Sequence, residues 1–226
     1  MLDTQELEGK FSCQREDLAR VLLLDHIGSF RLTRRDERTQ TDLYFDTASL
    51  SLRDQSCSLR MRSVGDKHKA TFKGPRQAVD TAEDAAHAHL VARLEIEVAV
   101  VPPPLDGAAF IERLDLEPVS RARNLIGVEE QLNPIARLVT HRQMLHYERE
   151  AGEIIELSLD DVDALDLRND RATHILEVEL ELIEGTPETL VSAADSLRAA
   201  VPMLRPSVDS KLARTLGQTS QPAEAG

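Results

Sequence analysis

The chain has 226 residues and a formal net charge of −13 at pH 7, and this length is enough to bury the core of one large β-rich domain. Its acidic balance argues against a general nucleic-acid or anionic-membrane surface, which would carry an excess of Lys and Arg. No stretch is apolar enough to span a bilayer and no signal-like segment begins the chain, so we expect a cytoplasmic protein with reduced cysteines at Cys13 and Cys57.

The first predicted element is a strand at residues 6–10. Side chains alternate along a strand, so Glu6, Glu8 and Lys10 share one face and Leu7 and Gly9 the other. One charged face is ordinary for an antiparallel sheet, and for a single strand the solvent-facing interpretation is favoured. Carboxylates in this arrangement could also hold a hard divalent cation, which prefers oxygen ligands.

A helix follows at residues 16–26, where apolar residues recur at helical spacing before Gly28. Further along, alternating and apolar runs predict a series of antiparallel strands. Their expected ranges are 41–46, 58–64, 67–73, 93–100, 135–140, 143–149, 154–160 and 173–184.

Residues 77–89 are rich in Ala, Asp and Glu and predict a loop between strands. Its His87 and His89 form only a weak metal-site pattern, because no Cys or third His lies nearby. Two more helices are expected at residues 106–114 and 187–201, the second with Thr186 as its cap. The small, polar tail at 218–226 is typical of a disordered end or a linker.

Three other predicted strands also gather charge on one face. Arg60 and Arg62 share a side, Lys69 and Lys73 share a side, and the run at 177–182 places Glu177, Glu179 and Glu181 together. If all these faces pointed inward, they would line a cavity that holds acids and bases together. Such a cavity would suit a polyanion with its metal ions.

These elements resemble, in order along nearly the whole chain, the CYTH domain of the triphosphate tunnel metalloenzyme superfamily. Glu6-Leu7-Glu8-Gly9-Lys10 is similar to the N-terminal ExExK of that family. The other similar elements are Tyr44-Phe45-Asp46-Thr47, Leu59-Arg60-Met61-Arg62, Lys73, Arg93 to Glu97, Arg142, Asp160, Glu177-Val178-Glu179 and Ser210-Lys211. The likeness is nearest to the bacterial inorganic triphosphatase branch, in which a histidine-rich helical CHAD domain often follows.

The resemblance implies an α+β, mainly β fold over residues 1–217. We expect a closed antiparallel eight-stranded β-barrel, with a charged lumen that forms a tunnel and helices packed on the outside. The apolar faces of the strands would then point outward beneath the helices, and the ionisable faces inward.

The resemblance also implies hydrolysis of inorganic triphosphate with Mg²⁺ or Mn²⁺. The residues expected in catalysis are Lys10, Arg60, Arg62 and Asp160. Those expected to bind substrate are Lys10, Arg60, Arg62, Lys73, Arg93, Arg142 and Lys211. The expected metal ligands are Glu6, Glu8, Glu95, Asp160, Glu177 and Glu179.

Several alternatives stay open at this point. The same barrel hosts thiamine triphosphatases and class IV adenylyl cyclases, and a polyphosphate-binding module without turnover is a third reading. The chain has no Trp, two Tyr and five Phe, which favours an inorganic substrate over one whose ring must lie against an aromatic face. The roles of Lys69, Glu97, His141 and Glu181, the general base, the choice of metal and the oligomeric state are not readable from the sequence.

Overall fold

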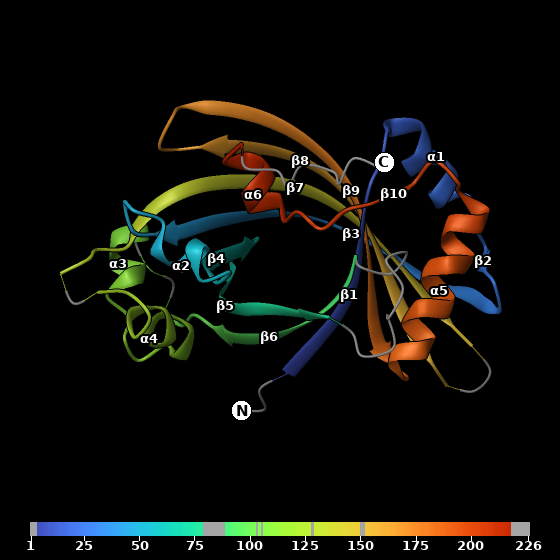
Figure 1. The fold of residues 1–226 in the computed structure, drawn as a ribbon, viewed down its shortest axis with the longest axis horizontal. Coiled ribbons are helices and arrows are strands. Elements are labelled where there is room, and N and C mark those ends of the chain that lie inside the picture. The colour runs from blue at the N-terminus through green and yellow to red at the C-terminus, as the bar shows by residue number, and fades with distance from the viewer. Residues whose placement is uncertain are drawn as a thin grey trace, which may run out of the picture.

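Eight antiparallel strands close into a barrel in the computed structural model, which describes residues 4–78, 89–102, 104, 106–127, 129–149 and 152–217 (Figure 1). Their order around the barrel is β1-β6-β5-β4-β3-β7-β8-β9, and β9 pairs back with β1. Full closure leaves no free edge along this path. The strands are β1 (Thr4–Ser12), β3 (Phe30–Asp46), β4 (Ser58–Val64), β5 (Lys67–Ala78), β6 (Leu90–Ala99), β7 (Asn133–Glu148), β8 (Ile154–Asp166) and β9 (Arg171–Glu184).

Two short strands and six helices complete the described chain. Strand β2 (His26–Ile27) pairs with β3, and β10 (Arg205–Pro206) pairs with β1. The helices are α1 (Arg15–Leu22), α2 (Ser51–Asp54), α3 (Gly107–Ile111), α4 (Glu117–Arg123), α5 (Pro187–Ala200) and α6 (Lys211–Thr215). Figure 1 shows α1 and α5 together at one side of the barrel and α2, α3 and α4 at the opposite side. In the described part of the chain, no helix has the length and apolar character that crossing a bilayer requires.

Most apolar faces of the strands point outward beneath these helices, as predicted, but Leu138, Val162 and Ile175 lie on the same strand faces as Arg142, Asp160 and Glu177 and form a buried cluster with Leu212 of α6. Phe11 on β1 and Val178 on β9 are fully buried in one cluster with Leu190 and Leu197 of α5. A second cluster joins the outer faces of β3 to β6 with side chains of α2, α3 and α4, such as the fully buried Phe110. Burial of these faces, at about 25 cal/mol per Å² of apolar surface, holds the helices against the barrel.

Two predicted strand boundaries were wrong in a way that matters for the lumen. Residues 135–140 and 143–149 belong to one continuous strand, β7, in which Arg142 lies opposite both Arg38 of β3 and Asp160 of β8. Strand β3 begins at Phe30, eleven residues before the predicted start at 41. Most side chains between Arg31 and Thr39 are polar and exposed, so this half of the strand has no alternating hydrophobic signal.

The remaining differences lie at element ends and in short helices. Helix α1 ends at Leu22 rather than at 26, and β5 runs to Ala78, past the predicted loop start at 77. Residues 79–88, which include His87, and the predicted tail at 218–226 lie outside the described residues. His89 is buried and its ring packs edge-on against Phe11, with 4.9 Å between ring centroids. Helices α2, α4 and α6 have only four to seven residues and were not predicted.

Candidate functional site

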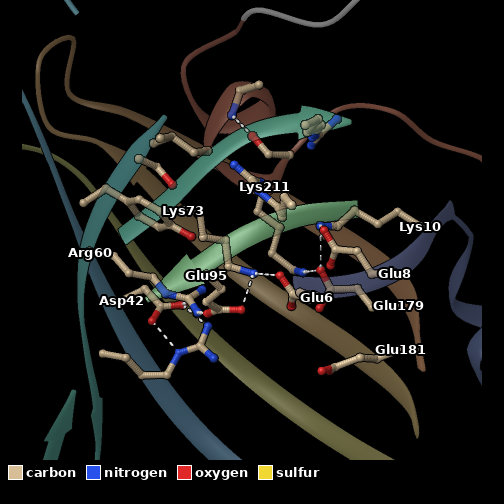
Figure 2. A pocket seen from close by; sticks show the side chains of 18 of the residues that line it. Glu6, Glu8, Lys10, Asp42, Arg60, Lys73, Glu95, Glu179, Glu181 and Lys211 are labelled. Carbon is tan, nitrogen blue, oxygen red and sulfur yellow. Dashed lines mark hydrogen bonds and ion pairs between the residues drawn. The ribbon is translucent and has the colours of Figure 1, made fainter. Parts of the chain in front are cut away.

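The barrel lumen is a cavity of about 810 Å³ whose lining is dominated by ionisable side chains (Figure 2). Every one of the eight barrel strands contributes, and α6 adds its first residues. The charged residues that line it are Glu6, Glu8, Lys10, Arg38, Asp42, Arg53, Arg60, Arg62, Lys73, Arg76, Arg93, Glu95, Glu97, Arg142, Glu156, Glu179, Glu181, Asp209 and Lys211. Acids and bases therefore share one enclosed space, as the sequence predicted.

The two arginines of β4 lie beside an acid of β3. Arg62 donates to both carboxylate oxygens of Asp42, through Nε at 2.7 Å and Nη2 at 2.8 Å. The register explains the pairing, because Asp42 lies directly opposite Arg62. Burial would raise the pKa of Asp42, but the charges of Arg62 and Arg60 lower it to about 2. Arg60 also lies 3.5 Å from Glu95 of β6, which links this group to the next one.

Lys73 of β5 is held between two carboxylates. Its Nζ lies 2.5 Å from Glu6 and 3.2 Å from Glu95, the residue opposite it on β6. Burial would lower the pKa of Lys73, but the charges of Glu6, Glu8 and Glu95 raise it above its usual range. Figure 2 shows Lys73, Glu6 and Glu95 pointing toward one another in the lumen.

Lys10 of β1 joins two of the predicted acidic strands. Its Nζ lies 2.6 Å from Glu8 on its own strand and 3.3 Å from Glu179, which is opposite it on β9. Glu8 and Lys10 are both buried. The ExExK side chains therefore face the lumen together, while Gly9 and Phe11 face the helix-covered side.

Three carboxylates gather at the junction of β8 and β9. Oxygen atoms of Asp160, Glu177 and Glu179 all lie within 4.8 Å of one another. We refer to these three residues as the carboxylate trio. Lys211, at the start of α6, places its Nζ 2.8, 2.5 and 2.8 Å from Asp160, Glu177 and Glu179, respectively. Arg142 donates to both oxygens of Asp160, at 2.7 and 2.6 Å, and to Glu179 at 2.5 Å.

These cations set the ionisation of the trio. Burial would raise the pKa of Glu179, but the charges of Lys211, Lys10 and Arg142 hold it well below its usual range. Burial raises the pKa of Glu177, and the neighbouring charge of Glu179 adds to this rise. Positive charge already lies where carboxylate oxygens converge, so the trio is arranged around a cation.

The six predicted metal ligands thus fall into separate groups. Asp160, Glu177 and Glu179 form the trio, Glu6 and Glu95 share Lys73, and Glu8 reaches Glu179 through Lys10. All seven predicted substrate-binding residues line the cavity.

The structure also places the residues that the sequence left open. Lys69 is half-exposed and pairs with Glu97 at 2.5 Å. His141 is exposed on the outer face of β7 and contacts the Thr39 hydroxyl at 3.0 Å. Glu181 points into the lumen apart from the other acids in Figure 2, and among the described residues it has no hydrogen bond or ion pair. Burial and the charges of Glu6 and Glu156 raise the pKa of Glu181 to about 8.

Six charged residues of the cavity lining were missed by the sequence analysis, namely Arg38, Asp42, Arg53, Arg76, Glu156 and Asp209. Arg38 preceded the predicted start of its strand, Arg76 followed the predicted end of its strand, and Asp42 lay inside a predicted strand without being selected. Gln40, Asp42 and Tyr44 alternate with Thr41 and Leu43, and this pattern was the available signal for Asp42.

Residues 4–216 match the CYTH domain family, so the match covers nearly all of the chain. The chain belongs to the CYTH domain family. Solved structures with the same fold include a putative adenylate cyclase from Bacillus halodurans, with 20% sequence identity, a TM-score of 0.60 and coverage of 92% of this chain and 96% of that one. A search of curated proteins finds no match to this CYTH domain.

Two further solved structures share this CYTH fold. One is a putative adenylyl cyclase from Hippeastrum, described as having a dominant triphosphatase activity, with 19% identity, a TM-score of 0.63 and coverage of 96% of this chain and 98% of that one. The other is the mimivirus capping enzyme triphosphatase, with 11% identity, a TM-score of 0.51 and coverage of 89% and 91%. At these identities the similarity establishes the barrel architecture.

Proposed function

We propose that this CYTH domain hydrolyses inorganic triphosphate to pyrophosphate and phosphate inside the barrel lumen, with Mg²⁺ or Mn²⁺ as cofactor. The observation that supports it most is the carboxylate trio, because its Glu179 lines the same cavity as Arg60, Arg62 and Arg142, while the fully buried Asp160 and Glu177 place their oxygen atoms within 4.8 Å of it. A site that only bound anions would gain nothing from clustered carboxylates, whereas a metal-dependent phosphate site needs both kinds of group.

The cations of the lumen would bind the phosphate chain. The planar forks of Arg60, Arg62 and Arg142 suit pairs of phosphate oxygens, and Lys10, Lys73 and Lys211 act as compact point charges. Arg93 is the remaining predicted substrate-binding residue. Each of the six others contacts a carboxylate in the structure, so substrate binding requires these cations to exchange or share their partners.

The carboxylate trio suits a hard divalent cation, because all its donors are oxygen atoms and a cationic group already lies among them. Asp160, Glu177 and Glu179 would hold one ion, and Glu6, Glu8 and Glu95 would contribute to a second. When bound, such ions polarise phosphoryl oxygens and acidify water.

The protein's own groups would position the chain and stabilise charge. Lys10, Arg60 and Arg62 would hold phosphate oxygens while negative charge shifts toward the leaving group, and the rigid barrel keeps them in place. Asp160 would fix the orientation of Arg142 through its two hydrogen bonds. Phosphoryl transfer of this kind depends mainly on positioning and electrostatics, so no protein nucleophile is required.

An inorganic substrate is favoured over thiamine triphosphate or ATP by the lining of the cavity. Among its described lining residues, Tyr44 is the only aromatic one, and it lies within a buried apolar cluster. A thiazole, pyrimidine or adenine ring would find few faces on which to stack. A class IV adenylyl cyclase, a thiamine triphosphatase and a polyphosphate-binding module remain the competing functions that the assay must separate.

The deciding experiment measures phosphate release from triphosphate, ATP and thiamine triphosphate, with Mg²⁺, Mn²⁺ or EDTA. We expect metal-dependent release that prefers triphosphate and falls at least about 100-fold in Glu179→Gln. Glu184→Gln, on the exposed end of the same strand, is the matched control and should keep full activity. Cyclic AMP formation from ATP would identify a cyclase instead, and metal-dependent triphosphate binding without release would identify a binding module.

A further inference from the structure

Two arginines lie directly opposite each other on neighbouring strands of the lumen. Arg76 of β5 pairs in register with Arg93 of β6, just after a register shift between Lys73 and Arg76. Both side chains line the cavity. Like charges at directly opposed positions of an antiparallel pair are destabilising unless something compensates them.

The next charged pair on the same two strands, Lys73 and Glu95, has opposite charges that neutralise each other. Lys73 lies opposite Glu95, and their side chains are 3.2 Å apart. Arg93 instead donates to two backbone carbonyls, that of Gly74 at 2.7 Å and that of Ser56 at 3.5 Å, and its buried Nε has no hydrogen-bond partner among the described residues. Lys73 and Glu95 therefore neutralise each other, whereas the guanidinium groups of Arg76 and Arg93 face each other without forming an ion pair.

Arg76 has even fewer contacts. Within the described part of the chain it makes no hydrogen bond and no ion pair, although it is not exposed. Burial and the charge of Arg93 lower the pKa of Arg76, so the folded protein disfavours this second positive charge. An anion placed between the two guanidinium groups would relieve the repulsion and supply the missing acceptors.

The size of the lumen leaves room for an anion longer than triphosphate. A triphosphate has thirteen non-hydrogen atoms, and even if each took the share of volume that a water molecule has in the liquid, about 30 Å³, the anion would occupy roughly 400 Å³. The cavity of about 810 Å³ therefore leaves room for a longer chain. Five of the six cations that contact carboxylates adjoin the trio or the Glu6–Glu95 group, and Arg62 pairs with Asp42. Arg76 and Arg93 form a second cationic element that makes no ion pair among the described residues, although Glu6 lies opposite Arg93 on β1 and the charges of Glu8, Glu177 and Asp209 offset part of the fall in the pKa of Arg76.

We propose that Arg76 and Arg93 form an additional phosphate subsite, so that the lumen accepts linear inorganic polyphosphates with at least one more phosphate than triphosphate. This inference rests on the proposed function, since it extends the same site. The additional phosphate would lie between the two guanidinium groups, and Arg76 would decide the preference for chain length.

Calorimetric titration of the whole chain with triphosphate and with linear tetraphosphate tests this without requiring turnover. We expect the native chain to bind tetraphosphate about 10-fold more tightly than triphosphate. Arg76→Gln should remove that difference and change triphosphate affinity less than about 2-fold. Arg76→Lys should restore part of the difference, because it keeps the charge but loses the fork. Arg137 is exposed on β7, so Arg137→Gln is the control and should bind triphosphate and tetraphosphate with the affinities of the native protein.

Equal affinity of the native chain for both anions would overturn the subsite while leaving triphosphate hydrolysis intact. If Arg76→Gln weakened the binding of triphosphate and tetraphosphate equally, the additional subsite would also be overturned, because Arg76 would then bind triphosphate itself. No binding of triphosphate by the folded native chain would remove the proposed function and the subsite together. Circular dichroism of each variant confirms that any lost binding is not lost folding.

Discussion

The ammonium group of Lys211 lies 2.8 Å from a carboxylate oxygen of Asp160, which is fully buried. The same Nζ reaches Glu177 and Glu179 as well. Burial would lower the pKa of Lys211, but the charges of these three acids raise it well above its usual range. The last described helix thus supplies the cation that holds the carboxylate trio together.

A metal ion in the trio would compete with this ammonium group. Lys211→Met is therefore expected to raise the affinity for Mn²⁺ by at least about 10-fold, because it removes a competing charge in contact with three carboxylates. Without metal, the variant should lose about 3 kcal/mol of unfolding free energy, since buried acids lose their partner. Titration calorimetry with Mn²⁺ and urea unfolding measure the two effects.

The control for this experiment is Lys67→Met, an exposed lysine of β5. It should change neither the affinity for Mn²⁺ nor the unfolding free energy by a measurable amount. An unchanged or weaker Mn²⁺ affinity in Lys211→Met would mean that the trio does not bind the metal, and the assignment of Asp160, Glu177 and Glu179 as ligands would be withdrawn.

The Asp42–Arg62 pair predicts a pH dependence of stability. The folded-state pKa of Asp42 is lowered by Arg62 and Arg60 to about 2, below its ordinary value of 3.8. A lowered carboxyl pKa contributes stability that is fully present above the ordinary value and is lost as pH falls toward the folded value. The contribution is about 2 kcal/mol at neutral pH.

Asp42→Asn resembles the protonated acid, so its cost should be largest at pH 6 and should shrink as pH falls from 4 toward 2. Urea unfolding of the native chain and the variant across this range checks the expectation. Glu37→Gln, an exposed acid on the same strand, is the control. A cost that stays constant with pH would show that the loss is one of packing and not of charge.

Charge and alternation coincide in several strands and so predicted the charged faces of the lumen, whereas the closed barrel was predicted from the resemblance to the CYTH domain. Glu6, Glu8 and Lys10, like Arg60 and Arg62, lie on alternate positions of short strands, so one face could be assigned without knowing the partner strand. The resemblance to the CYTH domain added Arg93, Arg142 and Lys211, which no local pattern distinguishes from ordinary surface cations.

The remaining lumen contacts depend on how distant segments pack together, which local sequence patterns do not specify. The predicted strand ended at Lys73, but the strand continues past Gly74 and Pro75 through an irregular register, and so Arg76 reaches the lumen. Lys211 contacts Glu177 across 34 positions of sequence. Contacts of this kind follow from how a short helix packs on the closed barrel, which an alternation pattern cannot specify.

Gly9 provides a test of how the ExExK strand packs. A Cβ atom at this position would lie 2.6 Å from Cδ2 of Leu90 on β6, closer than real Cβ contacts. We expect Gly9→Val to lower the unfolding free energy by about 1–3 kcal/mol, because the added atoms overpack a buried face. The control is Val64→Ala, at a partly exposed site, which should lower the unfolding free energy by less than Gly9→Val does. Gly65 is unsuitable as a control site because its φ is positive. An unfolding midpoint in urea equal to that of the native chain would contradict the close approach of β1 and β6.

Arg142 contacts two members of the carboxylate trio and is proposed to bind the substrate. Its guanidinium donates to both oxygens of Asp160 and to Glu179, and a lysine could keep the charge but not the two parallel hydrogen bonds. We expect Arg142→Lys to raise the KM for triphosphate about 10-fold and to lower the unfolding free energy by about 1–2 kcal/mol. Arg137→Lys, exposed on the same strand, should leave both unchanged. If Arg142→Lys loses stability but keeps the native KM, Arg142 serves only to hold Asp160 and does not contact the phosphate chain.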